Sequence, residues 1–97
     1  MERSYAVYIM ANRRHGTIYT GVTNDLIRRV QEHREGQFDG FTKQNGCTHL
    51  VWFDTTDDIE ADIAHEKRIK KWRRSWRDAL IEKTNPHWRD LWWDIIR

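Results

Sequence analysis

The sequence predicts an α+β domain in which a small three-stranded antiparallel sheet is flanked by three or four helices. Two short β-type segments lie on either side of a glycine-bearing turn near the amino terminus, and a third such segment lies near the middle of the chain. Most of the remaining apolar residues recur at helical spacing. Strands gathered early in a chain, with helices mostly after them, are typical of the α+β class, because α/β domains alternate the two.

The first element is an antiparallel hairpin over residues 5 to 22. Alternation along its first strand puts Tyr8 on one face together with Ala6 and Met10. Tyr19 occupies the corresponding face of the second strand. In an antiparallel pair the two phenols can therefore share one face of the sheet.

A helix from about Asp25 to Arg34 follows, because Thr23-Asn24-Asp25 supplies the capping chemistry that begins helices. Its inward stripe, at positions i, i+3, i+4 and i+7, consists of Leu26, Arg29, Val30 and His33. A guanidinium and an imidazole on the inward side of a helix are costly unless they have a function. Arg28 points about 100° away from Arg29 and is expected to be a solvated surface charge.

The middle of the chain contributes a loop, a strand and a helix. The stretch from Glu35 to Gly46 carries three glycines among polar residues, which predicts a loop and a candidate substrate contact. A third strand is expected from about Thr48 to Phe53. Asp57-x-x-Glu60 then resembles a capping box with Asp57 as the cap, and the helix that it begins reaches about Trp72.

The carboxyl-terminal part is expected to be helical. Ser75 is the expected cap of a helix that extends to about Lys83. Asn85, followed by Pro86 at the first helical position, opens a short last helix. With 97 residues, 38% of them hydrophobic, the chain suits one small domain, residues 1–97, with one core. We therefore expect no second domain.

Charge and cysteine content predict a soluble protein with a polyanionic partner. The net charge of +2 is modest, but seven cations fall between Lys67 and Arg77, shortly after an acidic stretch from Asp54 to Asp62. Cys47 is the only cysteine, which excludes an intrachain disulfide and a cysteine-rich metal site and suits the reducing cytoplasm. Apolar runs are all far shorter than the roughly 20 residues needed to span a bilayer, so we expect a cytoplasmic protein without membrane contact.

Two tyrosine triplets carry a resemblance to a known family. Ala6-Val7-Tyr8 and Tyr19-Thr20-Gly21, with Arg29 and His33 after them at helical spacing, resemble the ordered motifs of the GIY-YIG nuclease superfamily. The chain departs from these motifs at Ala6 and Thr20, and both departures spare the tyrosines. Further stretches are similar to the small stand-alone bacterial branch of the family, namely Phe41-Thr42-Lys43, Leu50–Phe53, Ala64–Trp72 and Asn85–Leu91.

The resemblance implies roles for four residues of the hairpin and the first helix. Tyr8 is expected to help deprotonate the attacking water, although a phenol with a pKa of about 10 needs cations nearby, and Tyr19 to orient water or phosphate. On spacing alone, both remain open to a simpler interpretation as strand aromatics. Arg29 is expected to bind phosphate oxygens as negative charge develops on them. His33 is expected to assist Tyr8 in proton transfer or to hold a phosphate oxygen.

Glu66 is the candidate metal ligand. A helical projection places it between Ile59 and Ile69, inside the apolar stripe, where a carboxylate is either paired or bound to a cation. Spacing alone leaves open an i,i+4 pair with Lys70. The resemblance to the single metal-binding glutamate of the family implies a ligand for one Mg²⁺ or Mn²⁺ ion, which keeps several waters when bound to protein.

The basic segment Lys67–Arg77 interleaves its cations with Trp72 and Trp76, which lie one helical turn apart. Cations beside exposed aromatic faces suit single-stranded nucleic acid, although such segments are often just solvated faces and the indoles can instead anchor helices in the core. Residues predicted to contact nucleic acid are Lys43, Lys70, Trp72, Arg74 and Asn85. For Lys43 and Asn85 this follows from the resemblance, and Asn85 is equally open to a role as a helix cap.

The resulting hypothesis is a divalent-metal-dependent endonuclease that hydrolyses phosphodiester bonds in DNA, with single-stranded or structured DNA as its substrate and DNA repair as its setting. RNA as a substrate, a protein partner and a dimer stay open. The alternative is a non-catalytic nucleic-acid-binding module that uses the basic, tryptophan-bearing helix and only packs its tyrosines. A purely structural interaction protein is disfavoured, because it explains neither Arg29 with His33 nor Glu66.

Overall fold

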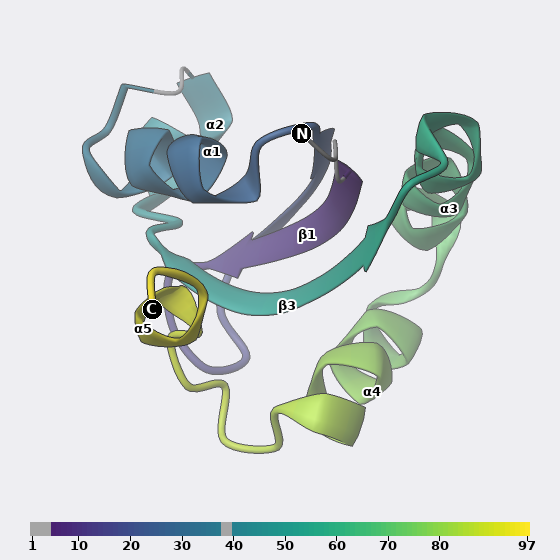
Figure 1. Ribbon diagram of the computed structural model, residues 1–97. Helices are drawn as coiled ribbons and strands as arrows, with labels where there is room; N and C mark the ends of the chain where they lie inside the picture. Colours follow the sequence, from purple (N-terminus) through teal and green to yellow (C-terminus); the bar gives the residue numbers. More distant parts are fainter. Residues whose placement is uncertain (1–4, 38–39) are drawn as a thin grey trace.

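A central strand, β1 (Tyr5–Ala11), pairs antiparallel with β2 (Ile18–Thr23) on one side and with β3 (His49–Thr56) on the other (Figure 1). The computed structural model describes residues 5–37 and 40–97. Its helices are α1 (Leu26–Arg34), α2 (Gly40–Asn45), α3 (Ile59–Lys71), α4 (Arg74–Thr84) and α5 (Trp92–Ile95). The predicted α+β class and the three-stranded antiparallel sheet are confirmed.

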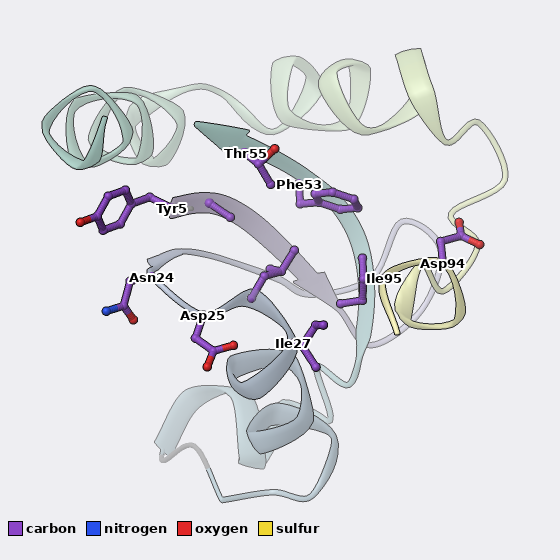
Figure 2. Close-up of a pocket in the computed structure, with 10 residues that line it drawn as sticks. Tyr5, Asn24, Asp25, Ile27, Phe53, Thr55, Asp94 and Ile95 are labelled. Atoms are coloured by element: carbon purple, nitrogen blue, oxygen red, sulfur yellow. The ribbon is translucent and has the colours of Figure 1, made fainter. Parts of the chain in front are cut away.

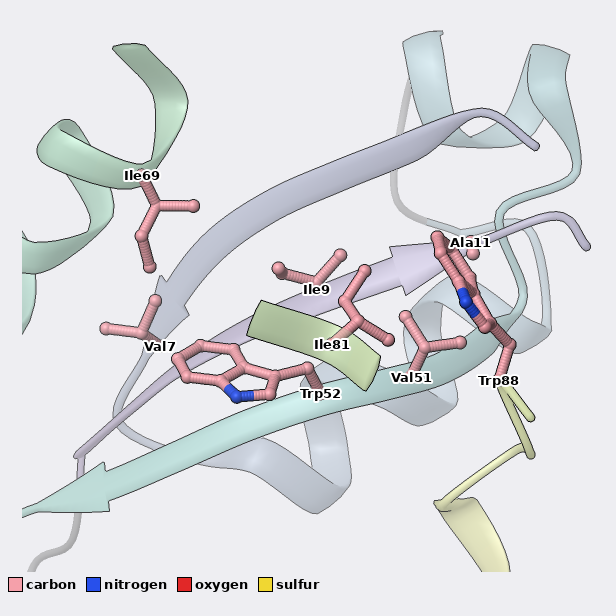
Figure 3. Close-up of a cluster of buried hydrophobic side chains, with 8 residues drawn as sticks. All are labelled: Val7, Ile9, Ala11, Val51, Trp52, Ile69, Ile81 and Trp88. Atoms are coloured by element: carbon pink, nitrogen blue, oxygen red, sulfur yellow. The ribbon is translucent and has the colours of Figure 1, made fainter. Parts of the chain in front are cut away.

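The two faces of β1 carry two separate hydrophobic cores. Val7, Ile9 and Ala11 point to the face covered by α3 and α4, here called the α3/α4 face. They pack there with Ile69 of α3 and Ile81 of α4 (Figure 3). Each of these five side chains is buried, and the tryptophans Trp52 and Trp88 complete this hydrophobic core.

The opposite face, here called the α1/α5 face, receives Tyr8 and Met10. They pack with Val30 of α1, with Leu50 of β3 and with the partly buried Ile95 of α5. Strand alternation separates the two sets along β1, as the sequence predicts. The hydroxyl group of Tyr8 therefore lies within the hydrophobic core of the α1/α5 face.

A β-bulge lies in β3 at Val51. Ile9 of β1 is opposite Trp52, whereas the next residue, Met10, is opposite Leu50, so Val51 is the extra residue. Because of the bulge, the neighbours Val51 and Trp52 both pack on the α3/α4 face, while Leu50 packs on the other. Strand alternation alone does not reveal this change of register.

Two helix starts differ from the sequence-based prediction. The cap of α3 is Asp58, whose Oδ1 accepts hydrogen bonds from the backbone N–H groups of Glu60 and Ala61 at 3.1 and 3.2 Å. The predicted cap was Asp57, one residue earlier, because Asp57-x-x-Glu60 has the spacing of a capping box. At α4 the capping position is Arg73, whose side chain makes no capping hydrogen bond, so the predicted Ser75 cap was also wrong.

Asn85 ends α4 and does not open a helix at Pro86. Its side-chain Nδ2 donates to the carbonyl oxygens of Val51 and Arg89 at 3.0 and 2.8 Å, and its Oδ1 accepts from the N–H of Arg89 at 3.0 Å. The buried amide thus ties the segment after α4 to the bulge of β3. The last helix, α5, begins only at Trp92.

The stretch from Glu35 to Gly46, predicted to be a loop, contains the short helix α2. Two of its glycines mark helix ends. Gly36 has φ = 69° just after α1, where Gln37 N–H donates to the carbonyl of Glu32 at 2.9 Å in a Schellman arrangement. Gly46, with φ = 64°, directly follows α2. The loop prediction was therefore wrong in part, because glycine here ends helices as well as forming loops.

Asp62 is a buried carboxylate on α3 whose Oδ2 has no hydrogen-bond partner among the described residues. Burial raises the pKa of this carboxyl above its ordinary value, and the nearby Asp54 and Asp58 add to the effect. Its charged form therefore costs free energy in the folded protein.

None of the described helices is long and apolar enough to cross a membrane.

Asp62→Asn is expected to stabilise the protein at neutral pH. Because the native pKa is raised, the folded state binds the proton more readily than the unfolded state, and stability is lost as the pH rises through the native pKa. An amide avoids this cost, so the melting temperature at pH 7 should rise, by about 4–8 °C for each 1 kcal/mol gained in a domain of this size. Thermal unfolding followed by circular dichroism measures it.

The gain from Asp62→Asn should shrink as the pH approaches the ordinary carboxyl pKa of 3.8. Asp57→Asn, at an exposed position, is the control and should change the melting temperature little at either pH. A gain that is the same at pH 7 and pH 4 contradicts the electrostatic explanation.

Candidate active site

Three aromatic rings meet on the α1/α5 face, and we call them the ring cluster: Tyr8 of β1, Tyr19 of β2 and His33 of α1. The ring centroid of Tyr8 lies 6.3 Å from that of Tyr19 and 5.6 Å from that of His33. Tyr19 and His33 are 5.5 Å apart. The expectation that the two phenols share a sheet face is confirmed, and the inward stripe of α1 brings the imidazole to them.

The Oη atom of Tyr8 lies 3.0 Å from Nε2 of His33, and both side chains are buried. Burial lowers the pKa of His33 to about 4, with the nearby Arg29 guanidinium adding to this and Glu32 opposing it. The imidazole is therefore neutral at pH 7. A neutral imidazole whose proton is on Nδ1 accepts the Tyr8 O–H at Nε2.

Tyr8 is a neutral phenol at pH 7. Burial raises its pKa far above the ordinary value of a tyrosine, and the neighbouring Tyr19 adds to this, whereas the charge and hydrogen bonding of Arg29 favour the phenolate. The sequence suggests that cations would make Tyr8 a useful base. In the folded protein burial outweighs Arg29, so the hydrogen bond to His33 decides where the phenolic proton can go.

Gly21 lies directly opposite Tyr8 in the pairing of β1 with β2. A Cβ atom at Gly21 would lie 2.6 Å from both Cζ and Oη of Tyr8, which is far inside van der Waals contact. The last residue of the second triplet is thus a glycine because the Tyr8 ring rests on its backbone. The two departures from the family motifs, Ala6 and Thr20, leave this contact intact, since Thr20 points to the α3/α4 face.

Arg29 lies beside the ring cluster and is held by Glu32. Its Nε is 3.2 Å from Oε1 of Glu32, while Arg28 Nε is 3.6 Å from the other carboxylate oxygen. The Arg29 side chain is 31% exposed and that of Arg28 is 76% exposed, so Arg28 is the surface charge that the helical projection predicts. Sequence reasoning missed Glu32, although its i+3 and i+4 spacing from the two arginines was available as a signal.

Glu66 of α3 pairs with Lys70, as the i,i+4 spacing allowed. Lys70 Nζ lies 2.7 Å from Oε2 of Glu66 and 5.8 Å from the ring centroid of Tyr19. The Glu66 side chain is 13% exposed and that of Lys70 is 48% exposed. Although α3 covers the opposite face, this pair therefore reaches the ring cluster at Tyr19 on the outer strand β2.

The donor set at Glu66 fits a divalent ion that keeps most of its waters. The described residues contain no group of three or more His, Cys, Asp or Glu side chains that could enclose a metal. Glu66 is a single, mostly buried carboxylate that already carries a cation, the Lys70 ammonium. One carboxylate together with water and phosphate oxygens is a pattern that Mg²⁺ accepts.

The predicted nucleic-acid contacts separate into internal and exposed groups. Trp72 packs against the core of the α3/α4 face and edge-on against Trp76, with ring centroids 6.1 Å apart. Arg74 pairs with Asp78 at 2.7 Å and donates to the carbonyl of Gly16, so both of these residues serve the fold. The buried Asn85 side chain hydrogen-bonds to backbone groups, which favours the structural role that the sequence left open for it.

Trp76 is the exposed aromatic residue of this segment, and Arg73 lies over its ring at 5.3 Å from the centroid. The sequence-based prediction named Trp72 instead, because the two tryptophans lie one helical turn apart among the same cations. α4 covers the α3/α4 face, whereas the ring cluster lies on the α1/α5 face.

The backbone of Lys43, another predicted nucleic-acid contact, belongs to α2, and its side chain lies outside the described part of the protein.

His15, in the turn between β1 and β2, had no role in the sequence-based prediction. Its Nδ1 lies 3.6 Å from Asp78 Oδ2, its Nε2 lies 3.3 Å from Glu82 Oε2, and its ring centroid is 5.1 Å from that of Trp88. Trp88 Nε1 also donates to Glu82 at 2.8 Å. The hairpin turn is thus fastened to α4, on the face away from the ring cluster.

A hollow of about 420 Å³ lies on the α1/α5 face (Figure 2). Its lining is largely apolar, with Leu26, Phe53 and Ile95 among the contributors, and Asp25 and Asp94 lie on opposite sides of it (Figure 2). The carboxylates repel the negative charge of a phosphodiester, and the apolar walls do not attract it. The ring cluster, with its neighbouring cations, is therefore the better candidate for phosphate chemistry.

Gly21→Ala is expected to displace the Tyr8 ring and disconnect it from His33. The added methyl group occupies the space of the phenol, so the variant should lose roughly 1–3 kcal/mol of stability, the usual cost of overpacking. His33 should become more hydrated, and its pKa should rise from about 4 towards the ordinary 6.5. An NMR titration of the imidazole measures this.

Gly40→Ala is the control for Gly21→Ala. Gly40 has φ = 51°, so alanine strains the backbone there, but its Cβ would have no neighbour within 4 Å. It should cost stability without moving the pKa of His33. An unchanged His33 titration in Gly21→Ala contradicts the contact between Gly21 and the phenol.

Comparisons with known proteins identify the family. The model of the GIY-YIG catalytic domain matches residues 4–79. A UPF0213 protein of Aeromonas salmonicida (strain A449) is 26% identical over 83 residues, which cover 84% of this chain and 61% of that protein. A UPF0213 protein of Haloquadratum walsbyi is 34% identical over 67 residues, or 69% of this chain and 75% of that protein.

The fold of this chain is also similar to a solved structure. The solution NMR structure of a UPF0213 protein from Bacillus halodurans aligns with a TM-score of 0.54 at 27% sequence identity, and the alignment covers 84% of this chain and 86% of that one. The family match extends over both tyrosine triplets, α1 and α3. The chain therefore belongs to the GIY-YIG nuclease family.

Proposed function

We propose that this protein is a divalent-metal-dependent endonuclease that hydrolyses phosphodiester bonds in DNA, with single-stranded or structured DNA as substrate. The observation that carries the proposal is the 3.0 Å contact between Tyr8 Oη and a neutral His33 Nε2, beside the Arg29 guanidinium. A proton acceptor and a phosphate-binding cation thus lie together. Membership of the nuclease family supports a nucleic acid as the partner.

Tyr8 and His33 form a two-step path for the proton of the attacking water. The water gives its proton to Tyr8 Oη while the phenol gives its own proton to His33 Nε2, so the phenol is unchanged and the imidazole becomes cationic. The lowered pKa of His33 keeps the imidazole neutral over the neutral range, so Nε2 can accept the phenolic proton. Because Tyr8 is fully buried, water reaches its hydroxyl only when the surrounding side chains move.

Arg29 stabilises the pentavalent phosphorus centre. A planar guanidinium has five N–H donors in a fixed geometry, so Arg29 can bind the non-bridging oxygens as they gain charge while Glu32 holds its Nε. Tyr19, whose ring packs against both other members of the ring cluster, orients the water or the phosphate. Glu32 acts through Arg29 and is a positioning residue.

Glu66 is the proposed ligand of one Mg²⁺ or Mn²⁺ ion. GIY-YIG nucleases generally use divalent metals. When bound, such an ion neutralises charge on a phosphate oxygen and on the leaving oxygen. The contact of the Glu66–Lys70 pair with Tyr19 supports this position, since it lies next to the residues that handle the water.

The exposed pair of Trp76 and Arg73 supports single-stranded or structured DNA as the substrate class. An unstacked base can lie on an exposed indole while neighbouring cations neutralise phosphates, whereas stacked bases of a duplex cannot reach it. RNA presents the same faces and stays an alternative substrate. The same chemistry suits a role in DNA repair, in which a dimer or a protein partner would supply further selectivity.

A non-catalytic nucleic-acid-binding module is the second candidate, and the full burial of Tyr8 favours it. In that function the ring cluster only packs the α1/α5 face, and the basic segment binds the nucleic acid. The two functions differ in one measurable respect. A binding module holds DNA without changing it, whereas the endonuclease cleaves it.

Metal-dependent cleavage is the first expected outcome. The assay uses labelled single-stranded, duplex and branched DNA, and labelled RNA. The protein should cut these substrates with Mg²⁺ or Mn²⁺ and leave them intact with EDTA, and single-stranded or branched DNA should be cut fastest.

Glu66→Gln should abolish cleavage while keeping the fold and the affinity for DNA, because glutamine retains the shape and loses the charge that binds a hard cation. Undiminished cleavage by Glu66→Gln removes the assignment as a ligand, and binding without cleavage by the wild type supports the second candidate.

Arg29→Ala and Arg28→Ala form a matched pair, because each removes one of the two arginines that contact Glu32. Arg29→Ala should slow single-turnover cleavage by roughly 10²-fold or more, the scale of losing one strong oxyanion contact. Arg28→Ala, at a mostly exposed position, should weaken DNA binding modestly and leave the chemical step intact. Small and equal effects of both changes would show that α1 is only a charged surface.

A further inference from the structure

Lys70 differs from its neighbours in the basic segment in that its charge is directed into the candidate site. Its Nζ lies between the Glu66 carboxylate, at 2.7 Å, and the Tyr19 ring, with the centroid at 5.8 Å. Lys71, the next residue, is exposed on the same helix. Sequence reasoning grouped Lys70 with the nucleic-acid contacts, but its geometry associates it first with Glu66.

We propose that Lys70 is an internal counter-ion that competes with the divalent ion for Glu66 and thereby sets the metal affinity of the site. This inference rests on the proposed function, in which Glu66 holds the metal. The ammonium and a divalent ion both need the same carboxylate, and two cations at such short separation repel each other. Metal binding therefore requires Nζ to leave Oε2.

The surroundings of Lys70 lower the free-energy cost of moving its ammonium away from Glu66 when a divalent ion binds. A partly exposed i,i+4 pair is weak, since the ammonium of a side chain that is 48% exposed recovers hydration when it moves. The face of the Tyr19 ring offers the released ammonium a second, weaker attraction. Lys70 thus keeps the mostly buried Glu66 neutralised before metal binds and stays beside the site afterwards.

Mn²⁺ titrated into the metal-free full chain, followed by calorimetry or by the electron spin resonance of free Mn²⁺, tests the proposal without measuring activity. Lys70→Met should bind Mn²⁺ about fivefold more tightly than the wild type, the factor that corresponds to the upper range for an exposed ion pair. Lys71→Met removes the same charge from the adjacent position and should stay within about twofold of the wild type. Glu66→Gln should bind no Mn²⁺.

The outcomes separate this inference from the proposed function. Equal tightening by Lys70→Met and Lys71→Met means a general charge effect, and weaker binding by Lys70→Met means that Lys70 supports the metal. Either result overturns the inference and leaves Glu66 as the ligand. Mn²⁺ binding that persists in Glu66→Gln, or is absent from the wild type, overturns both the ligand assignment and the inference.

A second measurement guards against a folding defect in Lys70→Met. Thermal unfolding is recorded for the wild type, Lys70→Met and Lys70→Gln with and without Mn²⁺, because a ligand that binds only the folded state raises the melting temperature more when it binds more tightly. Both Lys70 variants should gain more from Mn²⁺ than the wild type. A smaller gain in both, or a larger gain in only one, contradicts the competition.

Discussion

The buried hydrogen bond between Tyr8 Oη and His33 Nε2 is the interaction on which the candidate site depends. It joins the central strand to α1 across the hydrophobic α1/α5 face, where an unpaired hydroxyl or imidazole nitrogen would be costly. Satisfying both groups fixes the rotation of α1 about its axis. Arg29, one turn before His33, is thereby directed at the phenol, and Gly21 is required beneath it.

The elements that sequence predicts well are those with a local period. The hairpin and α1 follow from alternation and from a helical stripe, and both are confirmed, including the shared face of the two tyrosines. The bulge at Val51 and the backbone contacts of Asn85 could not be predicted, because each depends on a partner more than 30 residues away. The cap of α3 was missed by one residue, since Asp57 and Asp58 are adjacent and both have capping chemistry.

Residue type alone also does not show which cations and aromatic side chains make contacts within the protein and which stay available to a partner. Trp72 and Arg74 look like nucleic-acid contacts in the sequence, but the fold engages one with the core and the other with Asp78 and the hairpin turn. Glu32 was overlooked because it lies beside the inward stripe of α1. The catalytic roles come from the resemblance to the family. The geometry adds which of these side chains lie close together and which are neutral at pH 7.

The sheet separates the two surfaces that a substrate is proposed to touch. Trp76 belongs to the α3/α4 layer and the ring cluster to the α1/α5 face, and a three-stranded sheet is only roughly 10 Å across. A polymer that contacts both must turn sharply round an edge of the sheet. Duplex DNA, with a persistence length of about 150 base pairs, resists such a turn, whereas an unpaired strand bends freely. Stiffness of the substrate would then select against intact duplex even where base identity plays no part.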